Sequence, residues 1–425
     1  MLLRVPILLL LTALASSALA DNASLEVAAR LTANDAVDSL SFGSHVALGG
    51  DIAVIGAAGS FASGTRAPAT YVFYRDSMGN WVQHQELPKG GAFSLQNDVL
   101  LIGDTVFVRN GAGDFVEQAR LRPADGGDDS FGEAVALFGN GKRAAVAAPF
   151  ATVAGRQLAG AVYIFDRGSD GRWLQTAKLS APPSATAENF GMALAGDGNT
   201  LVIGAPIAQQ SDATAAAYIF FDGDNGWTLQ RTVSGSGGMG WSVALGGDTA
   251  LIGTDGGPVY VYGRDNTGLW KRQATLAPPQ GASGEFGYAV ALNGNQALIG
   301  FPPPQVTFDT FGGSNPAPPN AGSILLYTRN AGGAWSETAT AGPFEESRNL
   351  GTTVALENGV VLTADAQAEA KGYDAAGVAY VLYTPEKAAT VPALNDGGGS
   401  GAFGLGAVLL ALPALLFRKG RSIRS

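Results

Sequence analysis

Hydrophobic and polar residues alternate through most of this chain, in short runs separated by glycine-rich turns. The stretch SFGSHVALGGDIAVIGAA (41–58) shows the pattern, with one alternating run, a Gly-Gly-Asp turn and a second, more apolar run. It returns in variant form at residues 130–149, 239–256 and 285–302. Period-two alternation bounded by turn residues predicts antiparallel hairpins rather than helices.

This stretch opens each of seven copies of a longer unit, with a period of about 50 residues that is typical of solenoids and propellers. A connection of variable length follows it, then an aromatic run such as AVYIFDR, then a run that often begins with Trp. β-Branched and aromatic runs between Asp-, Asn- and Gly-rich turns predict four antiparallel strands in each copy. The copies begin near residues 42, 92, 131, 190, 239, 286 and 350.

Seven four-stranded units predict an all-β, seven-bladed β-propeller over residues 21–386, because radial closure leaves only short strand edges open. The seventh copy lacks a fourth strand that begins with Trp. The run SLEVAARL (24–31) matches the fourth strand WLQTAKL (173–179), so we expect this N-terminal strand to close blade seven. A partial propeller of four blades and a β-helix are the alternatives to this fold.

Three motifs within the copies carry a family resemblance. The motif F-G-x-x-V-A-L begins the first strand, I-G-A-P (203–206) ends the second, and G-A-V-Y-I-F (160–165) forms the third. Together they resemble FG-GAP repeats, over residues 38–384. The resemblance implies a propeller like the head of integrin α chains and of many bacterial surface proteins, and with it a role in binding or adhesion.

Many proteins with these repeats hold calcium in a D-x-[DN]-x-D-G hairpin between the first two strands, where carboxylates and carbonyls supply the ligands. The corresponding turns of this chain, such as GGD (49–51) and NGN (293–295), have no room for spaced carboxylates. The resemblance admits calcium, but these turns favour no metal and no cofactor.

The two ends of the chain differ from the repeats. Residues 1–20 carry one Arg, an apolar run and a small-x-small ending, which predicts a secretory signal peptide cleaved after Ala20. A Gly-rich linker (387–400) leads to an apolar run (401–417) that is long enough for a short transmembrane helix. The basic tail (418–425) is expected to stay cytoplasmic, which leaves the propeller exported.

The C-terminal end also resembles a sorting signal. Gly397, Gly398 and Gly399, followed by the apolar run and the basic tail, resemble the GlyGly-CTERM signal of Gram-negative bacteria. The resemblance implies a rhomboid-type sorting protease and the secretion machinery as partners. It also implies cleavage near these glycines and a place in the cell envelope or on the cell surface. A plain membrane anchor and a buried helix of a soluble domain are the alternatives.

Composition removes several classes of function. The chain has no Cys, which excludes disulfides, thiolate metal sites and Cys nucleophiles. Its formal net charge is −10, and five of its 26 Lys and Arg residues lie in the signal and the tail. The exported part is therefore strongly acidic, which argues against nucleic acid as a partner. No G-x-S-x-G, H-E-x-x-H or Walker motif is present, so no enzyme activity is expected.

Candidate ligand contacts lie in the segments that the copies do not share, because variable loops on a constant scaffold are where binding usually evolves. The longest connection (301–322) carries Phe301, Phe308, Asp309 and Phe311. Rings on a Pro-stiffened loop could contact a glycan or protein surface. The alternative is that the loop packs its own Phe rings onto the blade.

Two residues on the predicted innermost strands also stand out. His45 occupies a position that other copies fill with Ala, Ser or Thr, and Trp241 follows the F-G-like dipeptide of its copy. We predict ligand contact for both, with Trp241 at one end of a central channel. Five other Trp residues share one position in their copies, which indicates structural packing: Trp81, Trp173, Trp227, Trp270 and Trp335.

These observations predict an exported, surface-displayed, non-enzymatic binding or adhesion module whose protein or glycan ligand the sequence does not identify. One alternative is a polysaccharide lyase or hydrolase on the propeller face, for which Asp125, Asp128 and Asp129 form an acidic cluster. The other alternative is a purely structural protein of the envelope.

Overall fold

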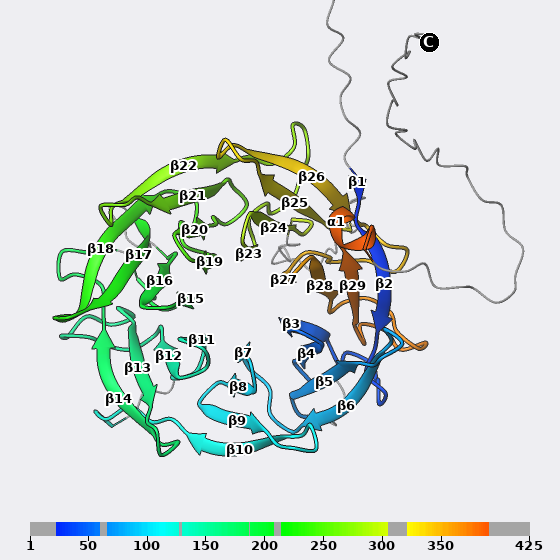
Figure 1. Cartoon of the computed structure of the whole chain (residues 1–425), viewed down its shortest axis with the longest axis horizontal. Coiled ribbons are helices and arrows are strands. Elements are labelled where there is room, and N and C mark those ends of the chain that lie inside the picture. The colour runs from blue at the N-terminus through cyan, green and yellow to red at the C-terminus, as the bar shows by residue number, and fades with distance from the viewer. Residues whose placement is uncertain are drawn as a thin grey trace, which may run out of the picture. The chain divides into compact units, whose positions relative to one another are not determined.

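The computed structural model describes residues 23–59, 66–126, 130–186, 188–207, 214–304 and 321–390. Seven sheets, each built on four antiparallel strands, stand around one centre, as Figure 1 shows. The prediction of an all-β, seven-bladed propeller is confirmed.

The strands of each blade follow one another from the centre outward. The innermost strands are β3 (Phe42–Gly49), β7 (Phe93–Gln96), β11 (Val135–Phe138), β15 (Ala193–Asp197), β19 (Val243–Gly246), β23 (Val290–Asn293) and β27 (Thr353–Glu357). The second strands are β4 (Ile52–Ala57), β8 (Val99–Ile102), β12 (Arg143–Ala148), β16 (Thr200–Ala205), β20 (Thr249–Ile252), β24 (Gln296–Phe301) and β28 (Val360–Asp365).

The third strands are β5 (Ala69–Arg75), β9 (Thr105–Arg109), β13 (Ala161–Arg167), β17 (Ala215–Gly223), β21 (Val259–Arg264), β25 (Ser323–Arg329) and β29 (Val378–Tyr383). The outermost strands are β6 (Trp81–Leu87), β10 (Phe115–Arg120), β14 (Trp173–Leu179), β18 (Gly226–Gly235), β22 (Trp270–Leu276), β26 (Trp335–Ala341) and β2 (Glu26–Leu31). A two-residue strand, β1 (Ala23–Ser24), and one short helix, α1 (Pro385–Ala388), complete the described elements.

The core lies between the blades rather than at the centre of the ring. Second strands such as β4, β16 and β28 are buried along their whole length. Most innermost strands, such as β7 and β23, are only partly buried, although each contacts the innermost strand of the next blade round the ring. The centre of the propeller is therefore accessible to solvent.

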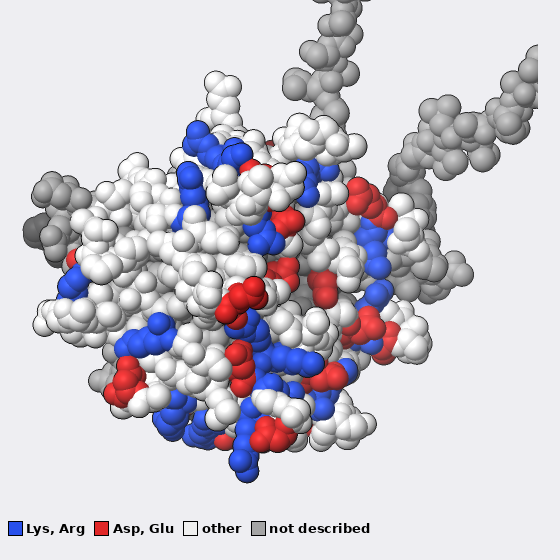
Figure 2. All heavy atoms as spheres, turned by 60° about the vertical axis from the view of Figure 1, so that its left-hand side comes forward, with Lys and Arg blue, Asp and Glu red and all other residues white. Residues whose placement is uncertain are grey.

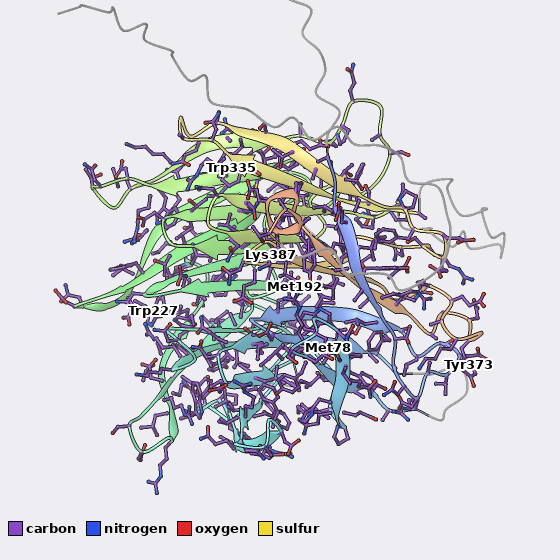
Figure 3. The ribbon with its side chains drawn as sticks, turned by 45° about the vertical axis from the view of Figure 1, so that its right-hand side comes forward. Met78, Met192, Trp227, Trp335, Tyr373 and Lys387 are labelled. Carbon is purple, nitrogen blue, oxygen red and sulfur yellow. The ribbon has the colours of Figure 1, made fainter. Side chains whose placement is uncertain are left out.

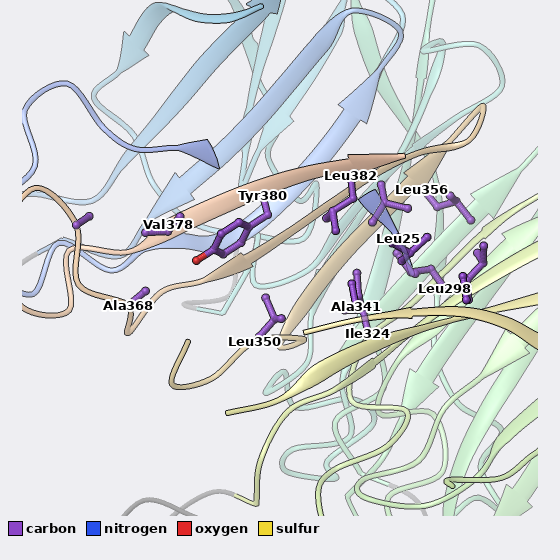
Figure 4. Packing of buried hydrophobic residues seen from close by; sticks show 14 of the residues in the cluster. Leu25, Leu298, Ile324, Ala341, Leu350, Leu356, Ala368, Val378, Tyr380 and Leu382 are labelled. Atoms are coloured by element: carbon purple, nitrogen blue, oxygen red, sulfur yellow. The ribbon is translucent and has the colours of Figure 1, made fainter. Parts of the chain in front are cut away.

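The N-terminal segment closes the ring. Strand β2 pairs antiparallel with β29, from Glu26 opposite Tyr383 to Leu31 opposite Ala379, and so supplies the fourth strand of blade seven. The sequence suggested one strand over 24–31, but the segment divides at Leu25, and β1 pairs parallel with β26 of blade six. Leu25 is 2% exposed and packs in the core between the two blades (Figure 4).

The F-G dipeptide forms the seam between consecutive blades. In blade one, Phe42 is fully buried, and its backbone N–H donates to the carbonyl of Ala376 in blade seven, at 3.0 Å. Gly43 has a φ of +105°, and a Cβ atom added there would lie 2.5 Å from the Cβ of Ala364 in blade seven. Only glycine fits this conformation and this close approach. The repeated motif therefore joins neighbouring blades.

A second seam lies at the outer rim. Every outermost strand carries a β-bulge at the same place. In blades one, two and four the bulged residue makes a hydrogen bond to the next blade. The bulged Gln118 accepts a hydrogen bond from Trp173 Nε1 at 3.3 Å, and Gln230 accepts one from Trp270 Nε1 at 3.1 Å. The Trp position expected to serve packing thus joins neighbouring blades.

The predicted terminal features lie outside the described residues. These are the signal peptide with Ala20, the glycines Gly397 to Gly399, the apolar run 401–417 and the basic tail. Within the part of the chain that the structure describes, no helix is long and apolar enough to span a membrane.

Candidate functional site

The propeller has two unlike faces. The turn face holds the hairpin turns that join first to second strands and third to fourth strands. The loop face holds the other connections, because antiparallel strands alternate in direction. On the turn face, six of the seven first-to-second turns have two residues. On the loop face, the second-to-third connections range from residues 103–104 in blade two to residues 302–322 in blade six.

The turn face makes most of its polar contacts with itself. Glu357 of blade seven accepts a hydrogen bond from the N–H of Gly50 in blade one, and Asp197 of blade four accepts one from Gly247 in blade five, both at 2.6 Å. Arg143 pairs with Asp166 at 2.9 Å and with Asp222 of the next blade at 2.7 Å. These contacts join neighbouring blades at their turns.

The turns also bear on the calcium question. A calcium hairpin needs several spaced oxygen ligands, whereas Gly50–Asp51 and Gly294–Asn295 are complete two-residue turns. Among the described residues, no group of three or more His, Asp or Glu side chains lies close enough to hold a metal ion. The expected absence of a metal stays a prediction.

The loop face carries a recurrent group that we call the tyrosine anchor. It consists of a third-strand Tyr, a carboxylate from the connection that enters the blade, and a cation. In blade three, Lys178 pairs with Asp125 at 2.6 Å, and the hydroxyl of Tyr163 lies 3.5 Å from the same carboxylate oxygen. The hydrogen bond from Lys178 lowers the pKa of Asp125. The anchor fixes this connection to its blade.

Blades one and seven repeat the tyrosine anchor. In blade one, the hydroxyl of Tyr71 donates to Asp35 at 3.4 Å, and Arg66 pairs with Asp35. In blade seven, Tyr380 donates to Glu346 at 3.3 Å, and Arg30 pairs with Glu346 at 3.3 Å. Burial raises the pKa of Tyr380 to about 12, so this hydroxyl keeps its proton.

Blade four has the tyrosine without the anchor. Tyr218 occupies the position of Tyr163 and is 2% exposed, but its hydroxyl has no hydrogen bond to any described residue. It lines a pocket of about 240 Å³ whose walls carry hydroxyl groups and small apolar groups. The other lining residues are Pro182, Ser184, Ala185, Thr186, Thr214, Ala216, Thr232 and Ser234. We call this the blade-four pocket.

A charged pocket of about 450 Å³ lies beside the closure of the ring, also on the loop face. It is lined by Arg30, Glu345, Glu346, Ser347, Arg348, Glu369 and Lys371. Beneath it, the fully buried Asp365 accepts hydrogen bonds from the N–H groups of Arg348 and Asn349, at 2.5 Å and 2.8 Å. Burial raises the pKa of Asp365.

Neither basic nor acidic side chains form a single large patch on the part of the surface seen in Figure 2. Basic and acidic side chains alternate there.

Sequence comparison gives these repeats a family. The model of the FG-GAP repeat matches residues 26–73, 115–165 and 173–220. The chain contains FG-GAP repeats. Each match begins in an outermost strand and ends in the third strand of the next blade. The sequence repeat is therefore offset by one strand from the blade, as the closure of the FG-GAP propeller by β2 requires.

Comparison of the FG-GAP propeller with solved structures gives low sequence identities. The computationally designed Ika8 protein is 14% identical, with a TM-score of 0.46 over 86% of this chain and 98% of that one. A protein from Lactobacillus plantarum is 13% identical, with a TM-score of 0.44 over 72% and 87%. A chain of the Mitotic Checkpoint Complex is 10% identical, with a TM-score of 0.39 over 90% and 99%. No curated protein sequence matches this chain.

The predicted contact at Phe301 needs correction. In the FG-GAP propeller this residue ends β24, is 6% exposed and packs its ring 5.8 Å from that of Phe286. It belongs to the core of its blade and has no face open to a ligand. The other predicted contacts of this connection, Phe308, Asp309 and Phe311, lie outside the described residues.

His45 and Trp241 lie on different blades and share no contact. His45 is exposed in blade one, where its Nδ1 lies 3.4 Å from Ser44 Oγ and its ring lies 5.9 Å from that of Phe93. Enclosure by the surrounding blades lowers the pKa of His45, which favours the neutral ring. Trp241 is half-buried in blade five, with its ring 5.6 Å from that of Tyr288. The structure therefore does not bring the two residues into one site.

Of the predicted acidic cluster Asp125, Asp128 and Asp129, the described member has a structural role. Asp125 is held by Lys178 in the anchor of blade three, while Asp128 and Asp129 lie outside the described residues. Sequence reasoning missed the tyrosine anchors. The third-strand Tyr is visible as a repeated letter, but its carboxylate partner lies in connections that the copies do not share.

Proposed function

We propose that this FG-GAP propeller is an exported, non-enzymatic binding or adhesion module that meets its ligand with the loop face. The observation that carries the proposal is the contrast between the faces. Turn-face hairpins are short and bond to one another, whereas loop-face connections vary in length and are fixed to the blades by tyrosine anchors. Rigid presentation of variable segments favours binding, since less ordering entropy is lost with the ligand.

Binding is favoured over a polysaccharide lyase or hydrolase by the state of Asp125, the one residue of the predicted acidic cluster that the structure describes. A general acid at neutral pH needs a raised pKa in a pocket. The pKa of Asp125 is lowered instead, by its hydrogen bond from Lys178. A purely structural envelope protein is the remaining alternative, and a binding measurement separates it from our proposal.

The location that we propose is the cell envelope or surface of a Gram-negative bacterium. The support comes from the signal peptide with Ala20, the apolar run 401–417 and the resemblance to a sorting signal. Rhomboid-type cleavage near Gly397 to Gly399 would release the protein. Mass spectrometry of the surface-exposed protein should find the tail 402–425 removed, and replacement of the three glycines should preserve it. An intact tail on the wild-type surface protein would reduce the signal to a membrane anchor.

The binding function is tested by probing glycan and protein arrays with the full-length chain in mild detergent, with and without EDTA. We expect at least one saturable ligand, unaffected by EDTA. Chain heated above its unfolding transition is the control. Absence of any saturable ligand on both arrays would favour the structural role, and polymer degradation by the chain would favour the enzyme.

A further inference from the structure

In three blades, a carboxylate of the chain itself accepts a hydrogen bond from the third-strand tyrosine. The hydroxyls of Tyr71, Tyr163 and Tyr380 each meet a carboxylate supplied by the connection that enters their blade. Because a buried hydroxyl without a hydrogen bond costs free energy, this position requires a partner. In blade five the same position holds Tyr260, which is only partly buried and whose hydroxyl has no hydrogen bond to a described residue. Three of the five third-strand tyrosines at this position therefore have an internal partner.

In blade four no described residue makes a hydrogen bond to this hydroxyl, which is open to the blade-four pocket rather than sealed in the core. Tyr218 is 2% exposed and packs its ring 5.4 Å from that of Phe190, which fixes the direction of its hydroxyl. Its cross-strand partner is Thr232, where blade three has Lys178 opposite Tyr163. No carboxylate or cation of the described residues makes a hydrogen bond or an ion pair with Tyr218, although burial, which raises the pKa of its hydroxyl, is partly offset by the nearby charge of Arg156.

The lining of the blade-four pocket decides the kind of ligand. Side-chain hydroxyls come from Ser184, Thr186, Thr214, Thr232 and Ser234, and among the described residues none that lines the pocket is charged. Hydroxyl groups both donate and accept hydrogen bonds, so their best match is a ligand that also does both. A charged ligand would lose its hydration without an opposite charge in return.

Size gives a second restriction. At about 240 Å³, the pocket is smaller than the range of roughly 300–1,000 Å³ that holds drug-sized ligands. It fits one ring-sized unit rather than a folded segment or several residues of a chain. Burial raises the pKa of Tyr218, so the hydroxyl keeps its proton and can donate to such a unit.

We propose that the blade-four pocket binds one neutral sugar unit of a glycan, with the Tyr218 hydroxyl as the buried hydrogen-bond donor. This inference rests on the proposed binding function and names its ligand class. The sugar unit takes the place of the carboxylate that completes the tyrosine anchor in blades one, three and seven.

The test uses the full-length chain in mild detergent and saturation-transfer NMR with four probes: the methyl glycosides of glucose, galactose, mannose and glucuronic acid. We expect at least one neutral glycoside to bind and the glucuronate to bind more weakly. Tyr218→Phe removes one oxygen atom from the pocket and should weaken the neutral glycoside about tenfold. Thr232→Lys, which introduces the residue found in blade three, should abolish binding.

Tyr163→Phe is the matched control, because it removes the same atom from a hydroxyl that already has an internal partner. It should leave glycoside binding unchanged, and thermal unfolding should show that all variants are folded. Equal affinity of wild type and Tyr218→Phe, preference for glucuronate, or no binding of any neutral glycoside would overturn the pocket assignment. If the arrays still report a ligand in that case, the proposed function stands without this site; if they report none, both proposals fall.

Discussion

The turn face and the loop face of this propeller are built from the same seven repeats, yet they use their polar residues differently. On the turn face, side chains at strand ends bond to the backbone of the next turn, as Glu357 does with Gly50. On the loop face, carboxylates from connections of unlike sequence bond to a repeated Tyr, as Asp125 does with Tyr163. The repeat builds the scaffold, and the loop face leaves two third-strand hydroxyls, Tyr218 and the less buried Tyr260, without a partner among the described residues.

The largest expected loss of stability comes from a substitution at the loop-face end of β3, compared with one at its turn-face end. Gly43→Val at the loop-face end places a β-branched residue at a φ of +105° and against Ala364. The combined backbone strain and overpacking should cost about 3 kcal/mol or more in the free energy of unfolding. Chemical unfolding measures it. Gly50→Asn is the control at the turn-face end, where no atom lies within 4 Å of an added Cβ; an equal loss there would contradict the seam.

The second effect concerns the buried carboxylate beneath the charged pocket. Asp365→Ala leaves the N–H groups of Arg348, Asn349 and Gln367 without their acceptor, and should cost about 2 kcal/mol or more. Since burial raises the pKa of Asp365, the folded state binds its proton more tightly than the unfolded chain does. The wild type should therefore gain stability relative to the variant as pH falls from neutral toward the unfolded pKa. A difference that shrinks on acidification would contradict this.

A smaller effect compares two surface aspartates. Asp125→Ala should cost up to about 1 kcal/mol, because its pair with Lys178 is partly exposed to solvent. The pKa of Asp125 is lowered, so its contribution is present above the unfolded pKa and is lost as pH falls through the folded pKa. Asp224→Ala on the turn face, at an exposed aspartate whose side chain has no hydrogen bond or ion pair with a described residue, should change the free energy of unfolding little. Equal effects of the two substitutions in a urea titration would count against the anchor.

The smallest expected effect is a gain in the free energy of unfolding, from a new hydrogen bond at the outer seam between blades seven and one. Trp81 Nε1 is buried and finds no partner among the described residues, and the bulged residue of the neighbouring blade seven is Ala28. Gln118 and Gln230 serve this purpose at two other seams. Ala28→Gln should add about 0.5 kcal/mol of stability. Ala28→Leu, of similar size without an acceptor, is the control. An unchanged midpoint of chemical unfolding for Ala28→Gln would contradict the role of the bulged Gln as acceptor for the Trp of the next blade.

The fold was predictable because its information is repeated. Seven copies of the F-G stretch gave the blades, and the likeness of SLEVAARL to WLQTAKL pointed to the strand that closes the ring. The parallel pairing of β1 was missed, because a two-residue strand leaves no pattern. Phe301 was misplaced for a related reason. It ends a second strand, where other copies have Ala57 or Ala205, and its larger ring fills the core instead of the loop.

The candidate site was less predictable because it depends on pairs of residues distant in sequence. Tyr163 and Asp125 meet only once the connection folds back on its blade. The open position at Tyr218 becomes visible only by comparison with three blades in which a carboxylate occupies it. The repeated sequence therefore predicts the scaffold. Contacts that are present in several blades but missing in another indicate where binding is expected.

The central claim, that ligands meet the loop face, has a direct test in a chain without cysteine. Single substitutions Ser184→Cys on the loop face and Met78→Cys on the turn face give two unique thiols for a polyethylene glycol maleimide. Figure 3 shows Met78 well apart from Tyr373, which belongs to the loop face. Array binding by the full-length chain is measured before and after modification. We predict that modification at residue 184 abolishes binding and that modification at residue 78 preserves it. Loss of binding only after modification at residue 78 would contradict the account.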